Sequence, residues 1–340
     1  MKNKLTVVIA TRPNIQNIQW IFKSLDVQTF QDFKIILVID TILKKYEFEK
    51  IKTESIKWLK NTSQKIFFIS NINTDFVPQS WVSHVRNYGI KMADTKFINI
   101  FDDDEIFDKD YLQKSFDLWH QIKNSNIPLM KRELGGSSIK KYQPPMSSSQ
   151  MGMGGFVLVP TLMFRKTGEI QSQGFDYYNF WLSRPHALRL NKNQKLAQIQ
   201  MFSGNSLFGL TKIFQQILFD ESLDFVYEDL EFTFRIHKAW YPLFVASDLL
   251  LYHMERDKNI LEHARVGSEF AAYRKAKHRI IFVRKNGTFL QKIQFYLFGF
   301  RGQPLWLMLK IIRYWKKREI IPLIFSLFKW TKDWLIWKIQ

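Results

Sequence analysis

Short, mostly apolar runs alternate with amphipathic helical patterns over the first hundred residues, and this alternation is the strongest constraint on the fold. The apolar runs, which have the length and β-branched content of strands, are Thr6–Ala10, Phe33–Ile39, Ile66–Ile69 and Phe97–Phe101. Helical periodicity lies between them, over residues 15–25, 46–60 and 81–92. Continuously apolar strands are typical of parallel sheets that helices cover on both faces. The sequence therefore predicts an α/β fold with a mostly parallel central sheet.

Polar residues follow several of these strands at the point where each strand ends. Thr11 follows the first strand, Asp40 the second, and the acidic run Asp102-Asp103-Asp104 the fourth. In open parallel sheets, ligands bind in the crevice outside the carboxyl ends of the strands. We therefore expect one crevice to collect these side chains.

The acidic run is a candidate site for a metal ion and a diphosphate. Three adjacent carboxylates repel one another unless a cation, a helix dipole or solvent relieves the repulsion. Because side chains alternate along an extended segment, Asp102 and Asp104 are expected to point the same way. Their hard oxygen atoms suit Mg²⁺ or Mn²⁺, which could bridge a diphosphate. The alternative is a solvated acidic loop that caps a following helix, and the run alone does not separate these interpretations.

A second polar group lies more than a hundred residues further along the chain. Glu228 and Asp229 begin a predicted helix, where the helix macrodipole favours carboxylates. His253 ends an apolar strand predicted over residues 248–252. Helix capping and a structural histidine are the simpler interpretation, whereas a general base and a metal ligand are the functional one.

Eight segments, taken in their order along the chain, match the pattern of a known family: Thr6–Arg12, Ser24–Thr29, Val38–Asp40, Val85–Ile90, Asp102–Asp104, Ser203–Asn205, Phe219–Glu221 and Glu228–Glu231. Together they resemble the family 2 glycosyltransferases with the GT-A fold, close to bacterial rhamnosyl- and galactofuranosyltransferase-like members. The resemblance covers about residues 5–255 and extends weakly into residues 273–285. A single Asp40 stands where many members carry two acids, and residues 131–180 align with nothing in the family.

This resemblance implies a metal-dependent, inverting transfer of a sugar from a UDP- or dTDP-sugar to a glycan or lipid-linked acceptor, in cell-surface polysaccharide synthesis. It implies that Asp229 is the catalytic base that deprotonates the acceptor hydroxyl. The residues implied in nucleotide and donor binding are Thr11, Arg12, Asp40, Arg86, Asn87, Asp102 and Asp103. The implied ligands of Mn²⁺ or Mg²⁺ are Asp102, Asp104 and His253, and the implied acceptor-side residues are Gly204, Glu228 and Glu231.

A sugar nucleotidyltransferase is an alternative enzyme class, because it also uses paired acids and a metal. Such enzymes usually carry a glycine-rich basic fingerprint near the N-terminus. The corresponding turn, Ala10–Asn14, contains no glycine.

Composition divides the chain near residue 255. Residues 256–340 contain 19 Lys or Arg against 5 Asp or Glu, and they also contain five of the 11 tryptophans. We expect a catalytic domain over residues 1–255, with a nucleotide-binding half over about 1–105, a flexible loop over 131–155 and an acceptor-binding half over about 156–255. A basic, Trp-rich helical extension is expected over residues 256–340.

The extension has the pattern of helices that lie in a membrane interface. Apolar stripes with tryptophans and flanking Lys or Arg suit that environment, and no run approaches the roughly 18 apolar residues of a spanning helix. Residues 300–340 are therefore expected to bind an anionic membrane surface, with packing on the catalytic domain as the alternative. Without a signal-peptide pattern or cysteines, we expect a cytoplasmic protein at the inner face of the cell membrane.

The competing class is a nucleic-acid-binding protein, which the net charge of +19 and the many aromatic side chains suggest. However, the positive charge is concentrated outside the α/β part, and no recognition motif is present. No nucleic acid partner is therefore expected.

Overall fold

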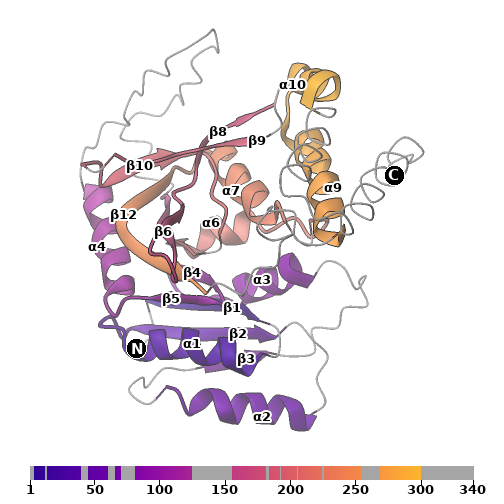
Figure 1. Cartoon of the computed structure of the whole chain (residues 1–340). Helices are drawn as coiled ribbons and strands as arrows, with labels where there is room; N and C mark the ends of the chain where they lie inside the picture. Colours follow the sequence, from indigo (N-terminus) through magenta and orange to yellow (C-terminus); the bar gives the residue numbers. More distant parts are fainter. Residues whose placement is uncertain are drawn as a thin grey trace.

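The computed structural model describes residues 4–11, 14–39, 45–59, 66–69, 81–124, 155–180, 184–191, 193–204, 206–223, 226–254 and 269–299. Within these ranges, ten strands form one sheet with helices packed around it (Figure 1). Three predictions concern residues outside these ranges: the donor contacts Arg12 and Asp40, the loop over 131–155 except Gly155, and membrane binding by 300–340.

The N-terminal part of the sheet is parallel, as predicted. Strand β1 (Leu5–Thr11) lies between β2 (Phe33–Ile39) and β4 (Phe97–Asp102), while β3 (Ile66–Ile69) pairs with the outer side of β2. Every residue of β2 is buried, which explains why its run is apolar apart from Lys34, whose ammonium pairs with Asp94. The intervening helices are α1 (Ile15–Asp26), α2 (Lys45–Ile56) and α3 (Trp81–Met92). These bounds confirm the predicted order of strands and helices.

The rest of the sheet contains both parallel and antiparallel strand pairs. Strand β11 (Leu207–Leu210) runs antiparallel between β4 and β6 (Val157–Phe164), and β6 is parallel to β12 (Leu243–His253). Strand β12 begins before the predicted position at residue 248, because Ser247 and Asp248 interrupt its apolar pattern at a shift in register. The remaining strands are β5 (Glu105–Phe107), β7 (Ile170–Ser172), β10 (Leu196–Ile199) and a separate hairpin of β8 (Phe175–Asn179) and β9 (Arg184–Ala187). The helices of this part are α4 (Tyr111–Asn124), α6 (Thr211–Gln216) and α7 (Glu228–Lys238).

Gly89 allows α3 to pack very closely on the sheet. A Cβ atom at this position would overlap Val8 Cγ1 of β1 and lie 3.2 Å from Val38 Cγ2 of β2. Any larger side chain would therefore push α3 outward. The close approach brings the preceding turn of α3, with Arg86, to the end of β4.

A second apolar core joins α7 to the helices that follow residue 268. These are α9 (Glu269–Asn286), α10 (Phe289–Gln294) and the π-helical turn η1 (Phe295–Gly299). Their buried partners come from β8, from α7, from the residues next to these two elements and from Met201. The cluster consists of Tyr178, Phe180, Met201, Tyr227, Leu230, Phe234, Ile280, Phe282, Val283 and Phe295. Residues 269–299 thus pack on α7, although their composition groups them with the basic extension. Across the ranges given above, none of the helices combines the length and the apolarity that a membrane crossing needs.

Candidate active site at the strand ends

The three aspartates lie in a tight turn between β4 and β5. Asp102 ends β4, Asp103 and Asp104 form the turn, and Glu105 begins β5. The backbone N–H of Met254 donates to the backbone carbonyl of Asp104 at 2.8 Å, so the end of β12 holds the turn in place. Because the run is a turn and not an extended strand, Asp102 and Asp104 contact different partners.

Asp103 connects the turn to β1 and α1. Its carboxylate accepts hydrogen bonds from Thr11 Oγ1 at 2.6 Å and from Asn17 Nδ2 at 3.2 Å. Burial raises the pKa of Asp103 to about 6, although both donors favour the ionised form. The expected meeting of Thr11 with the acidic run at the strand ends is therefore confirmed.

Asp104 lies next to His253, with 3.4 Å between Oδ2 and Nε2. The two side chains remain partly exposed, at 19% and 37% of their surface, so solutes can reach both. A carboxylate and an imidazole at this distance are a suitable pair of ligands for Mn²⁺. Over the residues that the structure describes, no group of three or more His, Cys, Asp or Glu side chains could hold a metal ion. Two of the three predicted ligands are thus adjacent, and Asp102 pairs elsewhere.

Arg86 of α3 links the aspartate turn to the start of α7. Its guanidinium donates to Asp102 Oδ1 at 2.8 Å and lies 3.4 Å from Glu228 Oε1. It also lies over the ring of Phe219, 5.3 Å from the centroid. Burial alone would lower the pKa of Arg86, but the carboxylates of Asp102 and Glu228 raise it. The buried guanidinium is therefore the charged counterpart of two acidic segments far apart in sequence.

Asn87, predicted to bind the donor, hydrogen-bonds through its side-chain amide to both backbone groups of Phe219, where a turn begins. Its side chain accepts from Phe219 N at 2.7 Å and donates to Phe219 O at 2.9 Å. The same amide donates to Glu221 Oε1 at 2.8 Å. Adjacent residues of α3 thus hold the aspartate turn, the Phe219 turn and α7 together.

The backbone before α7 is strained. Val226 and Tyr227 have φ angles of 64° and 79°, in the left-handed region that residues other than glycine rarely adopt. Nδ1–H of His278 in α9 donates to the Val226 carbonyl at 2.9 Å. The Tyr227 ring packs in the second core, 5.9 Å from the ring centroid of Phe282. Such conformations cost about 1–3 kcal/mol each and cluster at functional sites.

Asp229 follows this turn as a half-buried carboxylate. Burial, and next the charge of Glu228, raise the pKa of Asp229 to about 7, against a hydrogen bond that Leu230 N donates to Oδ1 at 2.7 Å. A general base acts best when its pKa lies near the working pH. The electrostatic influence of Arg86 and Asp102 on the same pKa places Asp229 close to the aspartate turn.

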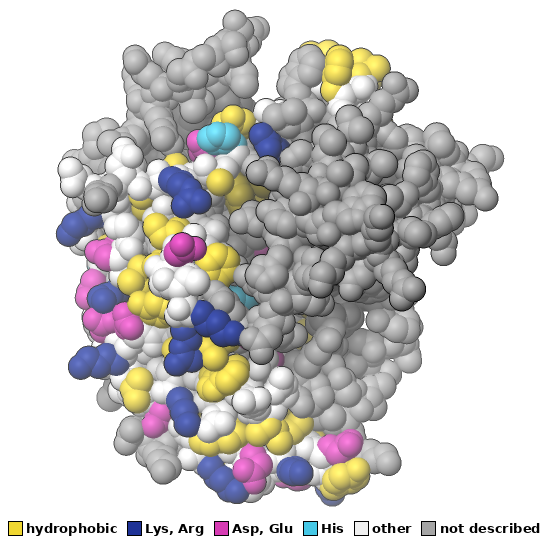
Figure 2. Space-filling model, in the orientation of Figure 1, with side chains coloured by type: hydrophobic (Ala, Val, Ile, Leu, Met, Phe, Trp, Pro, Cys, Tyr) yellow, Lys and Arg dark blue, Asp and Glu magenta, His cyan; other side chains and the backbone are white. Residues whose placement is uncertain are grey.

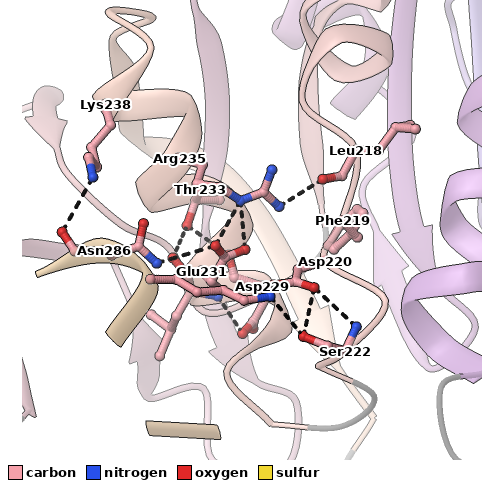
Figure 3. A network of polar contacts seen from close by, with 12 residues as sticks. Leu218, Phe219, Asp220, Ser222, Asp229, Glu231, Thr233, Arg235, Lys238 and Asn286 are labelled. Carbon is pink, nitrogen blue, oxygen red and sulfur yellow. Dashed lines mark hydrogen bonds and ion pairs between the residues drawn. The ribbon is translucent and has the colours of Figure 1, made fainter. Parts of the chain in front are cut away.

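Glu231 lies in a polar network on α7 that Figure 3 shows from close by. Both of its oxygens accept from Arg235 Nε, at 2.7 and 2.8 Å, and Asn286 Nδ2 donates to Oε1 at 3.3 Å. Arg235 also donates to the Leu218 carbonyl at 2.7 Å. These residues line a hollow of about 390 Å³ together with Asp220 and Lys285, which form an ion pair of their own. The network attaches α7 to the end of α9.

Gly204 occupies a position that only glycine fits. Its φ is 148°, and a Cβ atom would lie 2.7 Å from Leu162 Cδ1 and 2.9 Å from Phe202 Cε1. The neighbouring Phe202 N donates to Thr233 Oγ1 of α7 at 3.0 Å. The segment predicted to lie on the acceptor side is therefore attached to the helix that carries Asp229.

Two supporting residues, Glu105 and Asn17, have no assigned role in the sequence-based prediction. The buried Glu105 accepts from Asp102 N at 2.9 Å, and burial beside Asp102 and Asp104 raises the pKa of Glu105 well above its ordinary range. The sequence did contain a signal for Glu105, because it is the fourth consecutive acid after Asp102, Asp103 and Asp104. Asn17 gave none, because it is one of several polar residues in an amphipathic helix.

The parallel β3-β2-β1-β4 arrangement, the antiparallel β11 beside it and the acidic turn after β4 define the GT-A fold, as the sequence resemblance implied. The chain is similar to S. aureus TarS, residues 1–349, in complex with UDP-GlcNAc, with a TM-score of 0.53 and 15% identity over 97% of this chain and 81% of that chain. A second structure of TarS 1–349 gives a TM-score of 0.49 at 13% identity, over 98% and 91% of the two chains. No protein-family model and no curated protein matches this sequence. The likeness is one of fold.

Proposed function

We propose that this protein is an inverting glycosyltransferase of the family 2 type that uses a UDP- or dTDP-sugar and a glycan or lipid-linked acceptor. The observation that carries this proposal is the contact through Arg86 between the aspartate turn and the start of α7, where Asp229 has a raised pKa. The UDP-GlcNAc in the similar TarS structure supports a nucleotide-sugar donor. A rhamnosyl or galactofuranosyl donor, and a role in cell-surface polysaccharide synthesis, belong to the same proposal.

In this mechanism Asp229 accepts the proton of the acceptor hydroxyl. The hydroxyl oxygen attacks the anomeric carbon from the face opposite the diphosphate, and the electron pair of the breaking bond leaves with the phosphate oxygen. Asp104 and His253 would hold Mn²⁺ or Mg²⁺, with Asp102 as the third predicted ligand, and the ion would neutralise charge on the leaving diphosphate. Thr11 and Asp103 would form the adjoining wall of the donor site, with the predicted donor contacts Arg12 and Asp40.

Binding and turnover together test the proposal. Calorimetry should detect UDP or dTDP binding in the presence of Mn²⁺. A panel of nucleotide sugars should then reveal a donor whose diphosphate is released, slowly by hydrolysis and faster with an acceptor glycan. A protein that binds no nucleoside diphosphate with either metal, and releases none, would contradict it.

Asp104→Ala should weaken Mn²⁺-dependent UDP binding by at least about tenfold, because the carboxylate beside His253 is lost as a ligand. Calorimetric titration with and without Mn²⁺ measures the effect. His186→Ala is a matched control, because this exposed histidine pairs with Asp176 in the β8–β9 hairpin. Activity that survives excess chelator would show that the metal assignment is wrong.

Glu228→Gln should move the acidic limb of the pH profile of kcat/KM to lower pH. A base works only when deprotonated, so wild-type activity should rise with pH through about 7, the pKa of Asp229. Removing the neighbouring negative charge lowers that pKa, while the glutamine oxygen can still accept from Arg86. Glu221→Gln should leave the limb in place, since the charges that act on Glu221 are those of His84 and Lys91, whereas the acid that most raises the pKa of Asp229 is Glu228. An unmoved limb in Glu228→Gln would exclude Asp229 as the titrating base.

The cytoplasmic location and the binding of an anionic membrane by residues 300–340 remain part of the proposal. The proposed membrane-binding residues lie outside the ranges that the structure describes. Their support is the amphipathic, Trp-rich and basic pattern of that segment.

A further inference from the structure

Helix α10 and the start of η1 present an exposed stripe of large apolar side chains. Phe289, Leu290, Ile293 and Leu297 are exposed over 77%, 69%, 40% and 59% of their surface. Their spacing places all four on one side of the helix. Figure 2 shows hydrophobic side chains gathered at the end of the molecule where α10 lies in Figure 1. We call these four residues the α10 stripe.

The rest of this helical segment is anchored, so the α10 stripe has a fixed orientation. Thr288 and Gln291 form a capping box at the start of α10. Phe295 is fully buried, and the guanidinium of Arg279 lies 5.5 Å from the centroid of its ring. The α10 stripe is thus fixed at its start by the helix cap and at its end by the buried Phe295 of η1.

Basic residues accompany the α10 stripe. Residues 269–299 contain seven Lys or Arg and one Glu, of which Arg274 and Arg279 are buried. Arg284 and Lys285 are exposed at the end of α9, just before α10, and Lys292 lies on α10 itself. An apolar face with cations beside it matches the interface of an anionic bilayer, where apolar side chains enter below the headgroups and cations remain among the phosphates. A nucleic acid would use the cations, but among these four side chains only Phe289 could stack on a base.

We propose that the α10 stripe, with Arg284 and Lys292, docks on the surface of an anionic lipid bilayer. This surface is distinct from residues 300–340, to which the sequence pattern assigns membrane binding. The inference rests on the exposed side chains and the charges around them, so its test does not depend on whether the protein transfers a sugar.

The chain contains no cysteine, so one introduced cysteine can carry a single nitroxide label. The test variant is Leu290→Cys in the full chain. The control is Tyr46→Cys, at a side chain that is 65% exposed. Tyr46 belongs to α2, which lies at the end of the molecule opposite α10 in Figure 1. Each labelled protein is mixed with vesicles of phosphatidylcholine and phosphatidylglycerol, and the accessibility of the label to a water-soluble nickel chelate and to oxygen is measured.

We expect anionic vesicles to reduce nickel-chelate accessibility at position 290 severalfold and to raise oxygen accessibility there, with no change at position 46. Ile293→Cys should repeat the result one turn further along. Pure phosphatidylcholine vesicles should give a much smaller change, because the cations lose their partner.

Three results would overturn the proposal. One is a label at position 290 that stays accessible to the chelate while the protein sediments with the vesicles, since another segment would then bind the bilayer. Another is a label already shielded without vesicles, which would mean that the chain or a second copy covers the stripe. The third is shielding by nucleic acid and not by vesicles.

Discussion

Replacing Asp229 by asparagine should lower turnover by at least about a hundredfold, because general-base catalysis typically contributes 10²–10⁴ in rate. The substitution preserves shape, and the amide oxygen can still accept the hydrogen bond from Leu230 N. What it removes, on the proposed mechanism, is the carboxylate that takes the acceptor proton. Nucleotide binding should be nearly unchanged, because the aspartate turn and Arg86 keep their contacts.

The measurement has two parts: kcat with a saturating donor and acceptor, and calorimetric binding of UDP with Mn²⁺. Asp220→Asn is the control, because Asp220 is also an acid close to α7, and it pairs with Lys285. It should leave kcat within a few fold of the wild-type value. A near-normal kcat in Asp229→Asn would end the assignment of Asp229 as the base.

Arg86→Met should lower the free energy of unfolding by about 3–5 kcal/mol, the usual cost of removing one partner from a buried ion pair. The methionine leaves the carboxylates of Asp102 and Glu228 without their shared cation. Urea unfolding followed by circular dichroism measures the loss. Lys285→Met, which breaks the partly exposed pair with Asp220, should cost less than about 1 kcal/mol.

A double substitution separates charge from packing at this position. If uncompensated acids cause the loss in Arg86→Met, adding Glu228→Gln should restore part of the stability. If Arg86→Met costs no more than Lys285→Met, the guanidinium does not hold the two acidic segments together. A double variant no more stable than Arg86→Met would attribute the loss to side-chain packing.

The sequence was most informative where structure is local. Strands β1 to β4 and helix α3 lie where apolar runs and helical periodicity predicted them, because strands buried on both faces, such as β1, β2 and β4, leave a mostly apolar segment. The contact of Thr11 with Asp103 was predictable for the same reason, since parallel strands bring their carboxyl ends to one edge.

What the sequence could not reveal depends on distant packing. Arg86 and Glu228 are 142 positions apart, and no local pattern indicates that a helix of one half carries the counterion of the other. Side-chain alternation holds for extended chain, whereas Asp103 and Asp104 form a tight turn, and the structure gives Asp102 and Asp104 different partners in Arg86 and His253. Charge counting grouped residues 269–299 with the basic extension, although α9 buries Ile280, Phe282 and Val283 against α7.

The left-handed turn at Val226 and Tyr227 is supported by α9, which is synthesised after every other part of the site. A nascent chain that has just emerged past residue 254 already carries every acidic residue of the site. It still lacks His278 and Phe282, which hold the strained turn before Asp229. Under the proposed function, Asp229 would reach its working position only after α9 has docked, and a chain that ends before α9 would lack that support.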